Sequence, residues 1–207
     1  MNHPIRTLIV SASVLASAAA FAQNAPTPQT APPVGVRGAL TAVSDDAIKV
    51  HTNRGDDVTV KIDKDTQVRA VTLAKITDIQ PGSYIGTAAI PQPDGSQKAL
   101  EVHVFPPAMA GTGDGHRAFD LAPNSTMTNG TVGDLVVANG RTLTLKYKGG
   151  EKKIIVPDDV PIVNLLPGDK SLLKVGTKVV LFAKKAGDGT LSAGFISAGK
   201  DGVTPPM

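Results

Sequence analysis

Short segments in which apolar and polar residues alternate recur along this chain from residue 35 onward, and turn-forming residues separate them. Such alternation is typical of half-buried β-strands, because successive side chains of a strand point to opposite faces. In the first half the pattern predicts five strands, at residues 38–43, 47–52, 58–62, 84–90 and 99–105. Leu73, Ile76 and Ile79 recur every three residues, which predicts one short helix within 71–79, between the third and fourth strands.

The second half of the chain repeats the first at a spacing of 94 residues. The corresponding pairs fall on turn residues and apolar positions: Ile62 and Val156, Asp65 and Asp159, Val68 and Ile162, Gly82 and Gly176, Ile85 and Val179, Asp94 and Asp188. Upstream, Gly38 corresponds to Gly130 at a spacing of 92, so two residues are inserted in between. We therefore expect a tandem repeat of one structural unit.

Five strands with a helix between the third and fourth is the element order of a small OB-type barrel. The sequence thus predicts an all-β protein of two tandem five-stranded OB-like barrels, each with that short helix. The alternative is one β-sandwich built from both repeats. The expected modules are 35–105 and 127–203, and a Gly- and Pro-rich linker or functional loop, 106–126, separates them.

The first 22 residues have the pattern of a secretory signal peptide. Arg6 precedes an apolar run from Leu8 to Ala20, and Ala20-Phe21-Ala22 forms a small-x-small cleavage site before Gln23. The run is short for a membrane span and contains three serines, so we expect cleavage after Ala22 and a periplasmic protein that does not span the membrane. A Pro-, Ala- and Thr-rich spacer, 23–34, follows the signal.

The amino-acid composition excludes several kinds of chemical site and partner. The chain has no Cys, which excludes disulfides, a thiolate metal site, a thiol nucleophile and a lipid-anchored lipoprotein. Without Arg6, 20 of the 21 basic side chains remain against 18 acidic ones, and they are interspersed. That balance, with no Trp and two Tyr, does not favour a nucleic-acid partner.

Three strings resemble a bacterial family of exported OB-like domains of unknown function, often found in tandem behind a signal peptide. They are Val36-Arg-Gly-Ala-Leu-Thr-Ala-Val43, Ile79-Gln-Pro-Gly-Ser-Tyr-Ile85 and Leu173-Lys-Val-Gly-Thr-Lys-Val179. Glu101-Val-His-Val-Phe-Pro-Pro107 and Gly111-Thr-Gly-Asp-Gly-His116 are similar to members of it as well. The resemblance implies a fold and a compartment. It implies no activity, because the family has none established.

Histidines are the candidate metal ligands in a chain without thiols. Glu101 and His103 are two residues apart on one predicted strand and share a face. His116 and Asp114 lie in the loop that follows, and that loop can fold back onto the strand. Such nitrogen and oxygen ligands suit zinc or copper(II), and the nearby Met109 and Met127 suit copper(I). The alternative is that His116 lies in a glycine-rich turn and that no ligand set forms.

No catalytic motif accompanies these residues. The chain has no Gly-x-Ser-x-Gly elbow, and Gly111-Thr-Gly-Asp-Gly115 lacks the Lys of a phosphate-binding loop. We therefore expect a non-catalytic binding or interaction protein, with a periplasmic protein or a cell-envelope ligand as its partner. The alternative is a periplasmic copper- or zinc-binding protein that uses His103, His116 and Asp114.

Overall fold

The computed structural model describes residues 32–136 and 141–207 and shows an all-β protein. All described residues belong to one compact unit, Ala31–Met207. The predicted signal peptide and spacer residues 23–31 lie outside the described residues. The strands are β1 (Val34–Val43), β2 (Ala47–Thr52), β3 (Asp57–Lys61), β4 (Gln67–Leu73), β5 (Tyr84–Pro91), β6 (Gln97–Val104), β7 (Gly115–Ala118), β8 (Thr126–Val136), β9 (Thr142–Tyr147), β10 (Gly150–Ile155), β11 (Ile162–Pro167), β12 (Lys178–Lys185), β13 (Leu191–Ser192) and β14 (Phe195–Gly199).

The helices between strands are single turns. The described elements include three 3-10 turns, η1 (Ile76–Asp78), η2 (Pro107–Met109) and η3 (Lys170–Leu172). The helix expected within 71–79 is therefore not confirmed over that range: β4 occupies its first three residues, and only the 3-10 turn η1 follows. Leu73 is 71% exposed and ends the strand, so its three-residue spacing from Ile76 does not mark one buried helical face. None of the helical turns in the described ranges approaches the length that a membrane crossing needs.

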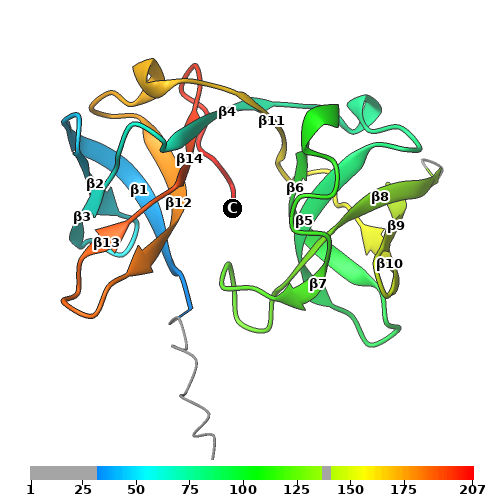
Figure 1. Cartoon of the computed structure of the whole chain (residues 1–207). Coiled ribbons are helices and arrows are strands. Elements are labelled where there is room, and N and C mark those ends of the chain that lie inside the picture. The colour runs from blue at the N-terminus through cyan, green and yellow to red at the C-terminus, as the bar shows by residue number, and fades with distance from the viewer. Residues whose placement is uncertain (1–31, 137–140) are drawn as a thin grey trace, which may run out of the picture. The chain divides into compact units, whose positions relative to one another are not determined.

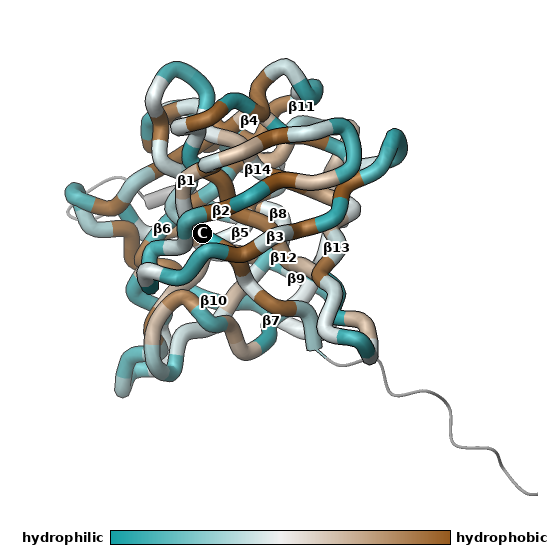
Figure 2. The backbone as a smooth tube through the Cα atoms, turned by 90° about the vertical axis from the view of Figure 1, so that its left-hand side faces the viewer, coloured by the Kyte–Doolittle hydropathy of each residue, from teal (hydrophilic) through white to brown (hydrophobic). Residues whose placement is uncertain are grey.

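Strand pairing closes a five-stranded barrel, which we call ring A. Its hydrogen-bonded order is β1-β2-β3-β13-β12, and β12 pairs back onto β1. A second set, ring B, has the order β8-β9-β10-β6-β5, and β5 pairs back onto β8. Each ring encloses its own apolar cluster, and the hydrophobic stretches of the chain lie mainly in the strands while the turns are hydrophilic (Figure 2).

The rings do not follow the expected division into tandem modules. Ring A takes β1–β3 from the first half of the chain and β12–β13 from the second half. Ring B takes β8–β10 from the second half and β5–β6 from the first. One barrel per module is therefore not confirmed, since each ring draws its last two strands from the other half. Hydrogen bonds join the fourteen strands into a single sheet.

Two crossing strands carry this exchange. β4 leads from ring A to ring B, β11 leads back, and the two pair antiparallel (Figure 1). Val71 lies opposite Leu165, which is its own counterpart at the spacing of 94 residues. The bounds of β5 and β12 differ by the same spacing: β5 spans 84–91 and β12 spans 178–185. The crossing therefore has the pairing expected of two equivalent halves related by a local twofold axis.

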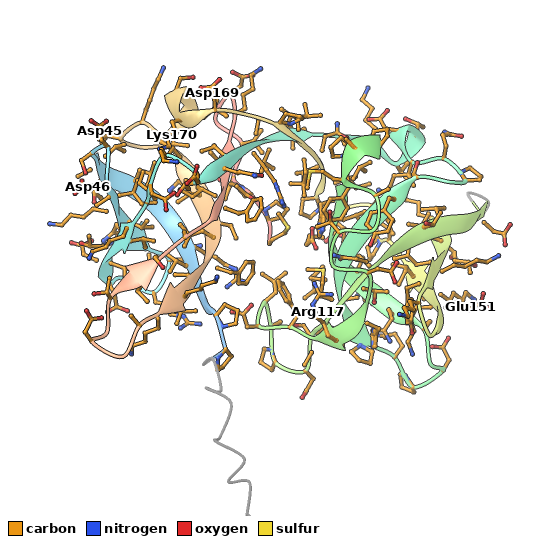
Figure 3. All side chains as sticks on the ribbon, viewed as in Figure 1. Asp45, Asp46, Arg117, Glu151, Asp169 and Lys170 are labelled. Carbon is orange, nitrogen blue, oxygen red and sulfur yellow. The ribbon has the colours of Figure 1, made fainter. Side chains whose placement is uncertain are left out.

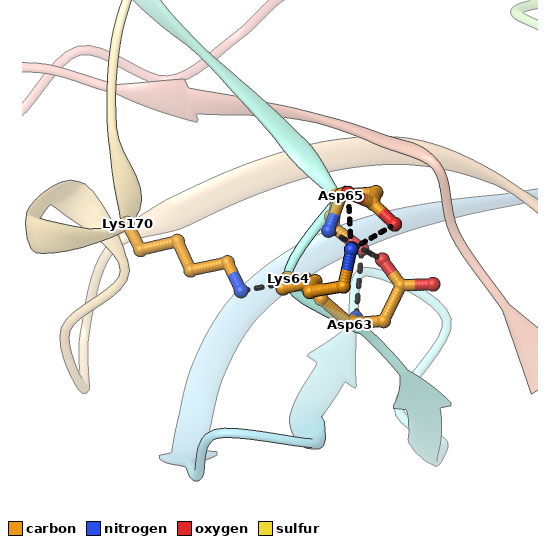
Figure 4. A network of polar contacts seen from close by, with 5 residues as sticks. Asp63, Lys64, Asp65 and Lys170 are labelled. Carbon is orange, nitrogen blue, oxygen red and sulfur yellow. Dashed lines mark hydrogen bonds and ion pairs between the residues drawn. The ribbon is translucent and has the colours of Figure 1, made fainter.

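A side chain from the second half also fixes the turn between β3 and β4. Lys170 of η3 donates a hydrogen bond from Nζ to the carbonyl oxygen of Asp63 at 2.6 Å (Figure 4). Within the turn, Oδ1 of Asp63 accepts from the backbone nitrogen of Asp65 and from Oγ1 of Thr66. The turn that sends the chain out of ring A is thus ordered both by its own residues and by the opposite half.

Gly38 is required by the close approach of β2 to β1. A Cβ at this position would lie 2.0 Å from the carbonyl oxygen of His51, which is a backbone atom and cannot rotate away. We expect Gly38→Ala to lower the free energy of unfolding by about 3 kcal/mol, measured by urea denaturation. Gly187→Ala is the matched control, because a Cβ there meets no atom within 4 Å. Equal stabilities of the two variants would contradict this packing of β1 on β2.

Candidate functional site

A cleft of about 1060 Å³ lies between the two rings. β4, β12 and β14 form the wall on the side of ring A. On the side of ring B the wall consists of β6, β8 and the segment from η2 to residue 119. Its apolar lining includes four phenylalanines: Phe105, Phe119, Phe182 and Phe195. The 106–126 segment, expected as a linker or loop, thus contains η2 and β7 and supplies part of this wall.

Three adjacent strands of ring B bring two polar side chains together at the cleft. His103 on β6 and Asn129 on β8 both lie opposite Gly86 on β5, which separates them. A Cβ on Gly86 would lie 2.1 Å from Nε2 of His103 and 2.5 Å from Oδ1 of Asn129. The absence of a side chain at Gly86 therefore lets the two polar groups converge above the middle strand.

The carboxylate of Glu101 fixes the orientation of the His103 imidazole. This carboxylate is fully buried and lies 3.0 Å (Oε2) and 3.2 Å (Oε1) from Nδ1 of His103. Oε1 also accepts a 2.7 Å hydrogen bond from the backbone nitrogen of Ala88, where the register of β5 on β6 shifts. A carboxylate can only accept, so Nδ1 donates, and a neutral ring then presents Nε2 as an acceptor.

Asn129 has an unused acceptor at this point. Its Nδ2 donates to the carbonyl oxygen of Thr112 at 3.1 Å, which fixes the orientation of the amide. Its Oδ1 is buried and has no hydrogen-bond partner among the described residues. An unpaired buried acceptor costs about 1–3 kcal/mol. The cleft thus contains a polar atom that a donor group of a ligand could satisfy.

The cleft is rich in cations. Lys61, Arg69, Arg117 and Lys184 line it, and none of the four forms an ion pair with a carboxylate of residues 32–136 or 141–207. Arg69 lies 4.5 Å over the ring of Phe195, and burial lowers the pKa of its guanidinium. Asp63 is the one acidic side chain among the described lining residues, and its Oδ1 is already hydrogen-bonded within its turn.

A contact between the rings bounds the cleft near Phe119 and Phe182. Arg37 of β1 forms a bidentate ion pair with Asp120, at 2.7 and 3.1 Å, and this hydrogen bonding holds the pKa of Asp120 below its usual range. The guanidinium carbon of Arg37 also lies over two aromatic side chains, 5.7 Å from the ring centroid of Phe119 and 5.5 Å from that of Phe182. This cluster ties the segment after β7 to the wall formed by β12.

Of the four predicted metal ligands, the structure brings together only Glu101 and His103. Nδ1 of His116 lies 2.8 Å from Oγ1 of Thr128, and the ring stacks on Tyr147. Thr128 precedes Asn129 on β8, so His116 lies on the sheet face opposite to His103. Burial and the charge of Lys152 lower the pKa of His116.

Asp114 also has a different partner. Its Oδ1 accepts from the backbone nitrogen of Lys148 at 2.6 Å. No group of three His, Cys, Asp or Glu side chains suited to a metal occurs in the described part of the chain. Copper or zinc binding through His103, His116, Asp114 and Glu101 therefore stays a prediction without an assembled ligand set.

Tyr84 at the edge of this region has a perturbed phenol. Its hydroxyl donates to the carbonyl oxygen of Thr112 at 3.1 Å. Burial, followed by the charge of Asp114, raises the pKa of Tyr84 to about 12. We expect stability to fall between pH 10 and 12, because the unfolded chain loses this proton near pH 10 and the folded chain near pH 12.

The titration can be isolated because the chain has only two tyrosines. In Tyr147→Phe, the ultraviolet absorbance of the phenolate reports Tyr84 alone and should give a midpoint near pH 12. Adding Asp114→Asn should lower that midpoint, since the neighbouring negative charge is removed. A midpoint near 10 in the folded protein would show that Tyr84 is not buried beside Asp114.

The sequence analysis missed Asn129, Arg69 and Arg117. Each lies in an ordinary strand context, and no local spacing connects them, because they come together only through the crossing of β4 and the pairing of β7 with β8. Comparisons of this chain with protein families, with characterised proteins and with solved structures found no match. The resemblance to exported OB-like domains therefore stays a prediction.

Proposed function

We propose that this protein is a non-catalytic, exported binding protein whose ligand occupies the cleft between ring A and ring B. The observation that carries the proposal is the buried Oδ1 of Asn129, which has no partner among the described residues and lies at the cleft beside His103. Protein interiors satisfy nearly all buried polar atoms, so an unsatisfied one in a cleft wall is a candidate contact for a hydrogen-bond donor of a ligand.

One further observation favours a binding role over covalent catalysis. His103 is oriented by Glu101 as a catalytic base would be, but no described hydroxyl group is hydrogen-bonded to its Nε2. A nucleophile within reach of the base is the usual mark of covalent catalysis. The proposal therefore assigns His103 and Asn129 to holding a ligand.

The proposal includes the architecture and the compartment. We infer that each ring is an OB-like barrel whose last two strands are exchanged between the halves of a tandem repeat, which agrees with the spacing of 94 residues between β5 and β12. Residues 1–22 direct export to the periplasm, and N-terminal sequencing of the envelope-associated protein should begin at Gln23.

A thermal-shift screen with a blocked variant tests the binding role. The panel holds cell-wall saccharides, organic acids and phosphate esters with their neutral analogues, and copper and zinc form a separate arm. A ligand at about a hundred times its Kd should raise the melting temperature by roughly 5 °C or more. Ser197→Trp places an indole in the cleft and should abolish that shift, whereas Thr59→Trp, at an exposed position of β3 outside the cleft, should not.

The outcomes separate the two candidate functions. No shift with any compound, or an equal shift in Ser197→Trp, would overturn the assignment of the cleft as the ligand site. A shift with copper or zinc that survives Ser197→Trp but is lost in the double variant His103→Ala and His116→Ala would instead establish metal binding.

A further inference from the structure

The geometry points to an organic anion with an apolar body as the class of ligand that the cleft binds, an inference that rests on the proposed binding function. Aromatic side chains supply one half of this chemistry. Phe195 and Phe182 remain 48% and 40% exposed at the cleft, although large apolar side chains gain stability when they are covered. An apolar ligand surface packed over them would remove that area from water.

Cationic side chains supply the other half. Arg69 and Arg117 reach the cleft from opposite walls, and neither forms an ion pair with a carboxylate of the described ranges. Nη1 of Arg117 donates to the carbonyl oxygen of Gly113 at 2.8 Å, which positions the guanidinium while leaving further N–H groups free for a ligand. Figure 3 shows Arg117 on the side of ring B that faces ring A.

The side chain of Asn129 lies beside this arginine through its amide nitrogen, and its Oδ1 lies toward Gly86 on β5. A Cβ on Gly113 would lie 3.0 Å from Nδ2 of Asn129 and 3.4 Å from Nη2 of Arg117, so the two side chains meet at one point of the wall. Together they offer guanidinium donors for an anionic group and the Oδ1 acceptor for a neighbouring N–H or O–H group. A ligand that combines a carboxylate, sulfonate or phosphate with an adjacent donor matches both.

Two dyes that differ only in an anionic group test this class directly. 8-Anilinonaphthalene-1-sulfonate carries an aromatic body, an N–H donor and a sulfonate, and N-phenyl-1-naphthylamine lacks only the sulfonate. Fluorescence titration of the whole protein should show one site that binds the sulfonate at least about tenfold more tightly, because charge-assisted hydrogen bonds are the strong ones. Arg69→Gln and Arg117→Gln should each remove most of that preference.

Control substitutions show whether the dyes bind in the cleft and which side chains select the sulfonate. Arg54→Gln removes an exposed arginine of the β2–β3 turn that does not line the cleft, and it should bind both dyes as the unmodified protein does. Asn129→Leu removes the acceptor and should weaken N-phenyl-1-naphthylamine more than the sulfonate dye, because the N–H group of the sulfonate dye already donates to its own neighbouring sulfonate oxygen. Ser197→Trp should abolish binding of both.

The results of the dye titrations decide separately whether the cleft binds a ligand and whether it prefers an anion. Equal affinity for the two dyes, lost in Ser197→Trp, would leave the cleft as a ligand site and overturn the anionic class. Binding of neither dye, or binding unaffected by Ser197→Trp, would overturn this inference. An advantage of the sulfonate that persists in both arginine variants would show that other cations select the anion and would contradict the roles assigned to Arg69 and Arg117.

Discussion

Replacing Glu101 with alanine should lower the free energy of unfolding by about 3–5 kcal/mol. Its carboxylate has no exposed surface and satisfies both the Ala88 backbone nitrogen and Nδ1 of His103. The truncation leaves two buried donors without an acceptor and opens a cavity at the edge of the cleft. Two-state urea denaturation at neutral pH measures the loss, and near-ultraviolet circular dichroism checks that the variant folds.

The chain offers a close control for this prediction. It contains one other glutamate, Glu151, which is exposed on β10, and Glu151→Ala should stay within about 0.5 kcal/mol of the unmodified protein. Glu101→Gln keeps an oxygen for Ala88 and should cost less than the alanine variant. Equal stability of Glu101→Ala and Glu151→Ala would show that the buried pair of Glu101 and His103 does not exist.

A disulfide between β1 and β12 should form readily and stabilise the protein by up to about 4 kcal/mol, because it closes a loop of well over a hundred residues. Ala39 and Lys178 lie directly opposite each other on these antiparallel strands, at a separation that a disulfide can span. The absence of native cysteines means that Ala39→Cys with Lys178→Cys can pair only with each other within one chain. Mass spectrometry and thermal unfolding, with and without reductant, measure the bond and its effect.

The same experiment distinguishes exchanged from tandem barrels. In a tandem arrangement β1 would pair with β5, and position 84, the counterpart of 178 at a spacing of 94, would face Ala39. Ala39→Cys with Tyr84→Cys should therefore stay reduced if the strands are exchanged. An oxidised 39–84 pair within one chain, together with a reduced 39–178 pair, would establish the tandem fold and contradict the structure.

The alternating pattern sufficed to predict most strands, because a half-buried strand carries a local signal of period two. The five strands expected in the first half coincide with β1, β2, β3, β5 and β6. The helix expected within 71–79 is not confirmed as one element, because Leu73 ends β4, Ile76 begins η1 and Ile79 follows η1. A short run of apolar residues cannot distinguish a crossing strand and a 3-10 turn from one helix.

The exchange of strands could not be read from local pattern. β5 and β12 have the same length and lie 94 residues apart, and the alternation along a strand does not specify which of the two pairs with β1. The choice depends on the packing of β4 against β11, which are 94 residues apart at the twofold pair of Val71 and Leu165. Contacts between residues so far apart in sequence do not produce a periodic pattern in either segment.

The candidate site was predictable only in part for the same reason. Glu101 and His103 lie two residues apart, so their shared face follows from strand geometry, and the structure brings them together. His116 and Asp114 are close in sequence but lie in and beside β7, where the pairing with β8 turns His116 toward Thr128. Asn129 became visible as a candidate only once its unsatisfied oxygen was located beside Gly86.

The most direct test of the central claim is a nuclear magnetic resonance map of where a ligand binds. Saturating 8-anilinonaphthalene-1-sulfonate should shift the side-chain amide of Asn129 and the backbone amides of Thr112, Gly113 and Ser197 most strongly, because all four residues line the cleft. The amides of the β2–β3 hairpin should not move. Shifts concentrated on that hairpin, with Asn129 unchanged, would contradict a ligand site between the rings.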